Sequence, residues 1–252
     1  MKPAAFALAV PGSLEAAAAS LASDAARAMG GGQSLGPMLN LRAARPGVVV
    51  PLARLAALHG AEDAADAVTL GAATTHATIA DGRTPDLEGR ILARIAGGIA
   101  YRAVRNRGTI GGSLCHADPA ADWLTTLLAL GASVLTTRRA IGLGQFVTGP
   151  YRTALAAGEI VRAVRIPRPV EARWGYHKLC RKPGEFAHAM AAALLAPAAR
   201  RLVLGATGGP PLVLEGAQAT LDGAAAALDG FDPVERALHL AAARRALAEA
   251  GA

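Results

Sequence analysis

The sequence predicts a globular protein that mixes helices and strands in two domains, at about 1–169 and 170–252. Short β-branched segments such as GVVVPL at 47–52 alternate with alanine-rich segments of helical spacing. At 252 residues and 52% hydrophobic residues, the chain is long and apolar enough to bury a core. No tandem repeat occurs, which argues against a solenoid.

The first part begins with a Pro11-Gly12 turn and Ser13 as the expected helix N-cap. The elements expected before the middle of the chain are a helix at 14–22, a strand at 25–29, a short helix at 35–41, and strands at 47–52 and 68–72. Thr74 or Thr75 is expected to cap the next short helix, which places His76 as a surface or capping histidine rather than a metal ligand.

Apolar residues four apart predict an amphipathic helix at 90–103. A second tight turn follows at 108–112, and Asp118 then caps a helix whose first residue is Pro119, with Asp122 about one turn inside it. The remaining elements expected up to Pro169 are a continuation of that helix at 124–130, ended by Gly131, and strands at 132–136 and 159–167.

Beyond the expected boundary after Pro169, the sequence predicts a small sheet followed by helices. Strands are expected at 174–179, 201–206 and 212–214, and helices at 215–228 and 233–249. Asp232 and Pro233 have the residue types of an N-cap and a first helical position. Alanine is the dominant apolar residue and aromatics are only 4%, so we expect these helices to pack closely through small side chains.

Gly30 to Leu35, GGGQSL, has the composition of an anion cradle, because glycine backbone can bring its N–H groups close to a phosphate. The spacing alone leaves a flexible turn as an equal alternative. The third glycine of the dinucleotide fingerprint is replaced by Leu35, and no Gly-Lys-Ser/Thr follows. The second turn carries Thr109 and Ser113, whose hydroxyls, with free amides, would suit a phosphate or a ribose.

The formal net charge of +7 permits a nucleic-acid partner, but the arginines are dispersed and no aromatic platform accompanies them, so none is expected. The two cysteines, Cys115 and Cys180, cannot hold a cysteine-ligated cluster and are expected to be separate buried thiols. Neither a signal peptide nor a transmembrane helix is expected from the apolar stretches.

Both glycine segments together, GGGQSLGPMLNLRAARPGVVVPL and VRNRGTIGGSLCHADPAAD, resemble the FAD-binding medium subunit of molybdenum hydroxylases, the carbon monoxide dehydrogenase and xanthine dehydrogenase group. The resemblance extends to EIVRAVRIP, HKLCRKPGEFA and LVLGATGGPPLVL. It implies an α+β fold: a two-lobed PCMH-type FAD-binding domain related to vanillyl-alcohol oxidase, with lobes at about 1–55 and 56–169, and a smaller C-terminal α+β domain of an antiparallel sheet and helices at 170–252.

The resemblance also implies the residues that would bind FAD. They are Gly30, Gly31, Gly32, Gln33, Ser34 and Leu35 in the first segment, Thr109, Ile110, Gly111, Gly112, Ser113 and His116 in the second, and Asp122, Lys178, Ile99 and Val161 around the ribityl chain and the rings. The family usually has alanine and leucine at the positions of Gly30 and Gly36, aspartate at Glu185 and often glutamine at Ala103, and the loops after Leu58 and around Arg138 are shorter here.

By the same resemblance, the chain is a cytoplasmic oxidoreductase subunit without a catalytic residue or a metal of its own. It would pass electrons from iron–sulfur clusters to an external acceptor through FAD. A large molybdopterin-containing subunit and a small 2Fe–2S subunit would be its partners, in a dimer of heterotrimers. The alternatives are a free-standing FAD-dependent oxidoreductase of the vanillyl-alcohol-oxidase-like fold and a basic interaction module that binds no chromophore.

Overall fold

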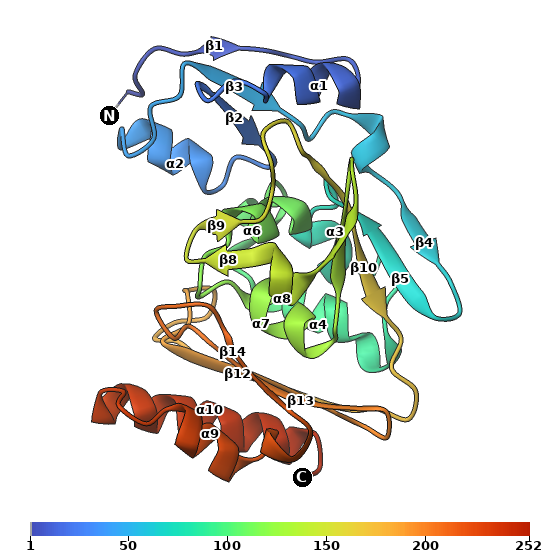
Figure 1. Cartoon of the computed structure of the whole chain (residues 1–252), viewed down its shortest axis with the longest axis vertical. Helices are drawn as coiled ribbons and strands as arrows, with labels where there is room; N and C mark the ends of the chain where they lie inside the picture. Colours follow the sequence, from blue (N-terminus) through green and yellow to red (C-terminus); the bar gives the residue numbers. More distant parts are fainter. Residues whose placement is uncertain (1) are drawn as a thin grey trace.

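The computed structural model describes residues 2–252, and three sheets follow one another along the long axis of the molecule (Figure 1). The first is a parallel sheet in the order β1-β3-β2, with two helices beside it. Its elements are β1 (Ala7–Leu8), α1 (Leu14–Ser20), β2 (Ala26–Met29), α2 (Leu35–Asn40) and β3 (Val48–Pro51). Ser13 caps α1 by accepting a hydrogen bond from the Ala16 amide at 3.2 Å, as predicted.

The middle of the molecule is an antiparallel sheet in the order β4-β5-β10-β6-β7, with helices packed against it. Its strands are β4 (Ala61–Asp63), β5 (Ala67–Gly71), β6 (Ser133–Thr136), β7 (Ala140–Gly142) and β10 (Val161–Pro167). Its helices are α3 (His76–Ala80), α4 (Ile91–Gly98), α5 (Arg102–Arg105), α6 (Ile110–His116), α7 (Asp122–Ala129) and α8 (Leu143–Phe146). A two-stranded ribbon, β8 (Val147–Gly149) with β9 (Arg152–Thr153), and 3₁₀ turns at Ala56–Leu58 and Glu88–Arg90 complete this part.

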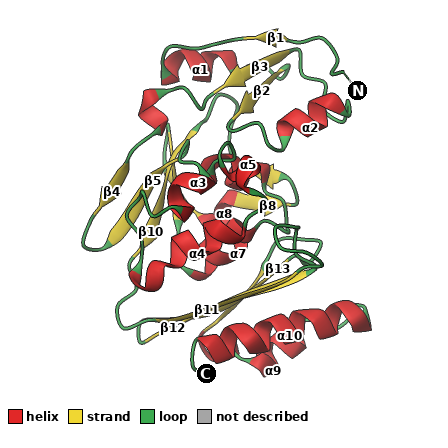
Figure 2. Cartoon of the chain, turned by 180° about the vertical axis from the view of Figure 1, so that it is seen from behind, coloured by secondary structure: helices red, strands yellow, loops and turns green. Residues whose placement is uncertain are grey.

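The third sheet is antiparallel, with α9 and α10 on one face and α7 on the other (Figure 2). Its elements are β11 (Arg173–Leu179), β12 (Ala189–Ala196), β13 (Ala199–Gly205), β14 (Leu212–Glu215), a 3₁₀ turn at Gly216–Gln218, α9 (Leu221–Ala227) and α10 (Pro233–Glu249). At Gly175 of β11 a Cβ would lie only 1.9 Å from the carbonyl oxygen of Ala246, so α10 approaches the sheet at backbone distance. Small side chains therefore permit close helix packing, as the alanine-rich composition predicted.

The structure thus has the α+β architecture expected from the sequence. The boundary that we place after Pro169 falls between β10 and β11. Leu194 of β12 nevertheless belongs to the same buried cluster as Leu124 and Leu127 of α7. The third sheet is consequently docked onto the middle of the molecule through α7. No helix within residues 2–252 is both long and apolar enough to cross a membrane.

Several local predictions were wrong at segments that contain glycine or proline. The second glycine turn is the start of α6, which Thr109 caps. The helix expected at 90–103 is interrupted after Gly98, where Ile99 is extended and Ala100 has a φ of 44°. Asp118 does not cap a helix that begins at Pro119; it accepts from the Ala120 amide in a turn, and α7 begins at Asp122.

Two errors concern the third sheet. No strand is among the predictions for Ala189–Ala196, yet this segment forms β12, the inner strand between β11 and β13. Alanine has low intrinsic strand preference, so the neighbouring strands and the covered faces decide this conformation. The helix expected from Glu215 begins instead at Leu221, where Thr220 supplies the cap and Glu215 still belongs to β14.

Candidate cofactor site

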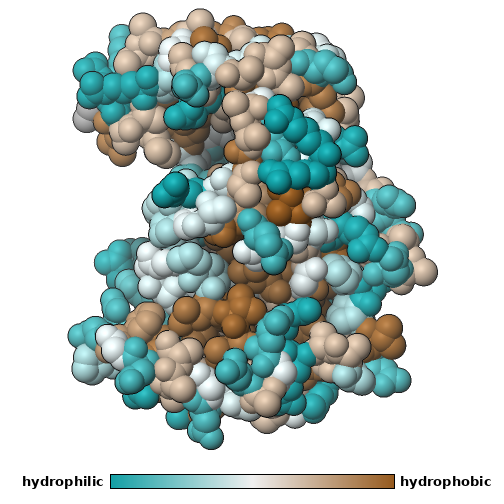
Figure 3. All heavy atoms as spheres, viewed as in Figure 1, coloured by the Kyte–Doolittle hydropathy of each residue, from teal (hydrophilic) through white to brown (hydrophobic). Residues whose placement is uncertain are grey.

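A cleft of about 620 Å³ lies between the N-terminal sheet with α2 and the middle of the molecule, and it appears as a deep hollow between these parts in Figure 3. All the predicted cofactor-binding residues except Ile110 line this cleft. Ile110 is fully buried in the core cluster around α7, so its side chain cannot reach a ligand there. Segments distant in the sequence thus meet around one cavity of the size that holds small molecules and cofactors.

The glycine loop between β2 and α2 supplies unpaired backbone donors to the cleft. Within residues 2–252, the amides of residues 31–35 have no protein acceptor, and the first amide of α2 that is satisfied is that of Gly36, which donates to Gly32 at 2.9 Å. Gly32 has a φ of 74°, a conformation that favours glycine. Ser34 stands at the N-cap of α2 without using its hydroxyl as a cap. This concave row of N–H groups has the character of an anion-binding nest.

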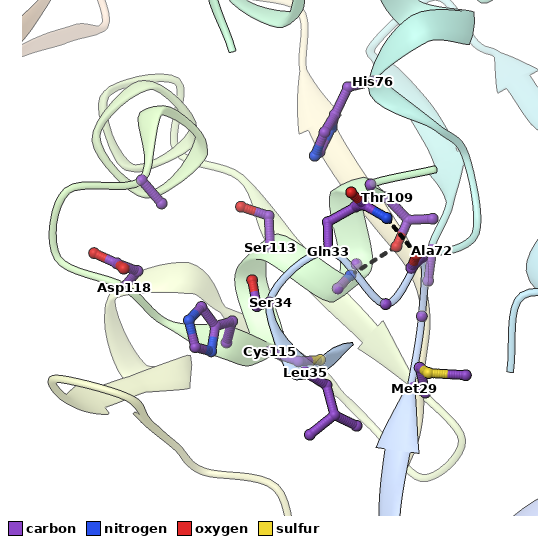
Figure 4. A pocket seen from close by; sticks show the side chains of 18 of the residues that line it. Met29, Gln33, Ser34, Leu35, Ala72, His76, Thr109, Ser113, Cys115 and Asp118 are labelled. Atoms are coloured by element: carbon purple, nitrogen blue, oxygen red, sulfur yellow. Dashed lines mark hydrogen bonds between the residues drawn. The ribbon is translucent and has the colours of Figure 1, made fainter. Parts of the chain in front are cut away.

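The two glycine segments pack backbone to backbone. A Cβ at Gly31 would lie 1.7 Å from the carbonyl oxygen of Arg107, and one at Gly30 would lie 2.9 Å from the Thr109 hydroxyl oxygen and 3.5 Å from Gly112 Cα. Gly30 and Gly31 are therefore required for this packing as well as for any approach of a ligand. Figure 4 shows Gln33, Thr109 and Ser113 on facing sides of this junction.

The second segment does not provide the free amides that the sequence suggested. Each of the first four amides of α6 is satisfied within the protein: Ile110 donates to Thr74 O, Gly111 to Ala72 O, Gly112 to Thr109 Oγ1 and Ser113 to Thr109 O, at 3.0–3.1 Å. What this segment presents to the cleft is a glycine surface together with Ser113, Cys115 and His116. Backbone recognition of an anion is thus confined to the first segment.

Asp122 and Lys178, predicted separately as cofactor contacts, are paired with each other. The Lys178 ammonium donates to both carboxylate oxygens of Asp122 at 3.0 Å, and the Tyr176 hydroxyl donates to the same carboxylate at 2.7 Å. Burial, and then the negative charge of Asp122, raise the pKa of Tyr176 well above its ordinary value. Sequence reasoning missed Tyr176, although it lies two residues before Lys178 and so shares its face of β11.

His76 is not the surface histidine that was expected. Its side chain is buried, and the Trp123 indole N–H donates to His76 Nδ1 at 3.2 Å. Burial, and then the nearby positive charge of Arg105, lower the pKa of His76 to about 4. The ring nevertheless forms part of the cleft lining. No local sequence signal could indicate the contact between His76 and Trp123, because the two residues are 47 positions apart in the sequence.

The expectation of two buried thiols was also wrong. Cys115 is exposed and lines the cleft. Cys180 is partly exposed, and both cysteines are free. Among the described residues, no group of three or more His, Cys, Asp and Glu side chains could hold a metal ion.

Comparison with known proteins identifies the family of this chain. Residues 4–169 match the family described as "FAD binding domain in molybdopterin dehydrogenase". The nicotine 6-hydroxylase medium subunit of Paenarthrobacter nicotinovorans is 38% identical over 207 residues, covering 80% of this chain and 73% of that protein. The carbon monoxide dehydrogenase medium chain of Hydrogenophaga pseudoflava is 34% identical over 69% of this chain and 62% of its own length.

Solved structures agree over the whole length. Carbon monoxide dehydrogenase from Hydrogenophaga pseudoflava superimposes with a TM-score of 0.88 at 28% identity, covering 100% of this chain and 99% of that chain. Quinoline 2-oxidoreductase from Pseudomonas putida 86 gives a TM-score of 0.86 at 31% identity with the same coverage. The match over 4–169, the medium-subunit relatives and the shared fold show that this chain belongs to the family of FAD-binding medium subunits of molybdopterin dehydrogenases.

Proposed function

We propose that this chain is the electron-transfer subunit of a molybdenum hydroxylase complex and that its cleft holds FAD. The observation that carries the proposal is the nest of unpaired amides at residues 31–35, open to a cleft of about 620 Å³, in a member of this family. FAD combines a dianionic diphosphate with apolar rings, and the cleft offers backbone donors at one place and apolar walls at others. The residues that are present therefore fit the cofactor.

The chain's own contribution would be binding and orientation. The amides of Gly31 to Leu35 would hold the diphosphate, with Gly30 beside them and with Thr109, Gly111 and Gly112 shaping the opposite wall. The hydroxyls of Ser34 and Ser113, the Gln33 amide group and the His116 ring would complete the polar contacts. The Asp122–Lys178 pair would face the ribityl chain, and Ile99 and Val161 would flank the rings. Bound FAD would supply the redox chemistry.

Partners follow from the proposed role. The relatives are named as medium subunits or medium chains, which places them in complexes with other subunits. We propose a large molybdopterin-containing subunit and a small 2Fe–2S subunit as partners, arranged as a dimer of heterotrimers in the cytoplasm. The small subunit would deliver electrons one at a time, and an external acceptor would receive them from this chain.

The cofactor proposal is tested by the absorption spectrum of the purified chain after incubation with FAD and gel filtration. The wild type should retain flavin bands. Gly32→Val should lose them, because a β-branched residue is strained at a φ of 74°. Gly36→Ala is the matched control, since nothing lies within 4 Å of a Cβ at that position. Full FAD retention by Gly32→Val would contradict the proposed nest.

The subunit role is tested by affinity purification of the tagged chain from its native cells. Two further polypeptides should copurify, together with molybdenum and iron in metal analysis. A chain that purifies alone and oxidises a substrate with bound FAD would be a free-standing oxidoreductase, and the subunit role would be wrong.

A further inference from the structure

His76 lies between the buried core and the cleft, and its core side fixes the position of its proton. The Trp123 indole nitrogen can only donate, and it lies 3.2 Å from His76 Nδ1. Nδ1 must therefore accept. In the neutral ring the proton then resides on Nε2.

The other edge of the ring faces the glycine junction. Within the described residues, Nε2 makes no hydrogen bond. It is not fully buried, so it retains accessible surface. The ring lines the cleft and points from α3 toward Gln33 in Figure 4. Its edge is held against Gly108, where a Cβ would lie 3.0 Å from Nε2, and Gly108 in turn packs against Gly31.

The surroundings keep this ring uncharged. Burial, and then the positive charge of Arg105, lower the pKa of His76 to about 4. Protonation of Nδ1 would also turn its contact with Trp123 into two opposed N–H groups. His76 is thus a neutral side chain with one N–H of fixed direction, and that donor has no partner among residues 2–252.

We propose that His76 is a cofactor-contact residue whose Nε2–H donates a hydrogen bond to an oxygen atom of the diphosphate–ribityl chain of FAD. Trp123 is a positioning residue that selects the required tautomer. This inference rests on the proposed function, because it needs FAD in the cleft.

The test is the dissociation constant of FAD for the full-length apoprotein, measured by quenching of flavin fluorescence. His76→Phe should raise the dissociation constant about tenfold, because it removes one hydrogen bond. The dissociation constant of His76→Gln should remain within about threefold of that of the wild type, because the glutamine amide can donate from a similar position. Trp123→Phe should weaken binding, because the neutral ring can then carry its proton on Nδ1 in place of Nε2. His188→Gln, at an exposed histidine, is the matched control.

A second measurement does not depend on the folding of a variant. The ¹⁵N spectrum of the wild-type imidazoles should show His76 as the Nε2–H tautomer at neutral pH, with its Nε2 resonance shifted by FAD. An Nδ1–H tautomer, an unshifted Nε2, or equal affinity in folded His76→Phe would overturn the inference. These outcomes presuppose that the wild type binds FAD; a wild type without measurable affinity would instead remove the proposed function itself.

Discussion

The Lys178–Asp122 pair is the most deeply buried ion pair that the cleft contains, with side-chain exposures of 11% and 5%. Removing one partner leaves a carboxylate in a poorly solvated place. We predict that Lys178→Met lowers the free energy of unfolding of the apoprotein by about 3 kcal/mol, as measured by urea denaturation.

Arg181 provides the control for this prediction. It pairs with Glu185 at 3.0 Å, but its side chain is 72% exposed. Arg181→Met should therefore cost at most about 0.5 kcal/mol. Equal losses in the two variants would show that burial does not determine the contribution of the Lys178–Asp122 pair.

Glu159 makes stability depend on pH. The Arg139 side chain, then the Ala156 amide and the Thr136 hydroxyl, hold the pKa of this buried carboxyl at about 2, below its ordinary value of 4.5. The unfolded chain takes up the proton first as the pH falls, so the stabilisation is present above about pH 4.5 and is lost toward pH 2.

The corresponding variant is Glu159→Gln. It should be about 2 kcal/mol less stable than the wild type at pH 7, and the difference should shrink steadily between pH 4.5 and 2. Urea denaturation at a series of pH values measures this difference. A difference that stays constant across this range would contradict the assigned pKa.

At the scale of single residues, the sequence predicted the contacts between residues that are neighbours in the chain. Ser13 and Asp232 were identified as caps because a cap and its amides are neighbours in the sequence. The contact of His76 with Trp123 depends on the docking of α3 against α7, and no spacing rule reports such a contact. The satisfied amides of Ile110 and Gly111 were missed for the same reason, since Thr74 and Ala72 reach them from a distant turn.

At the scale of elements, the approach of α10 to β11 is governed by Gly175. A Cβ there would lie 1.9 Å from the carbonyl oxygen of Ala246, so the helix would have to move away from the sheet. We predict that Gly175→Ala destabilises the protein by about 2–3 kcal/mol in urea denaturation.

The control is Gly97→Ala near the end of α4, where nothing lies within 4 Å of the added methyl group. This change should stabilise the protein by about 0.5–1 kcal/mol through helix preference. Destabilisation by Gly97→Ala of the same size as by Gly175→Ala would mean that contact with α10 is not the cause.

Helices and strands with a clear hydrophobic pattern or a capping residue were predictable from the sequence. Elements whose conformation depends on the adjacent strands or loops were not. β10 alternates buried and half-buried residues from Val164 to Pro167, and α10 begins with Asp232 and Pro233, so each was identified from its own residues. β12 is a strand because β11 and β13 flank it, and its alanines carry no such signal. The interruption after Gly98, which turns Ile99 toward the cleft, is likewise a result of packing around that loop.

At the scale of the whole molecule, the cleft combines segments that are distant in the sequence, and three of them illustrate this. The nest comes from the β2–α2 loop, the glycine wall from α6, and Lys178 from the third sheet. Recognition of the two glycine motifs together located the first two segments, and the resemblance to the family supplied the third. α7 links the glycine wall with the third sheet, because it carries Asp122 at its first residue and packs on β12 and β13.

This shared helix predicts that the chain unfolds as one cooperative unit, even though its sheets are separate. The two tryptophans test the prediction, because Trp123 lies in α7 and Trp174 in β11. Trp174 packs against both the core cluster around α7 and the small cluster of α7 with β12 and β13. In Trp174→Phe and in Trp123→Phe, the remaining tryptophan's fluorescence should change at the same urea concentration as the far-ultraviolet circular dichroism of that variant. If the Trp174 signal changed well before the helical signal, the third sheet would be unfolding independently, and α7 would not couple the two parts of the chain.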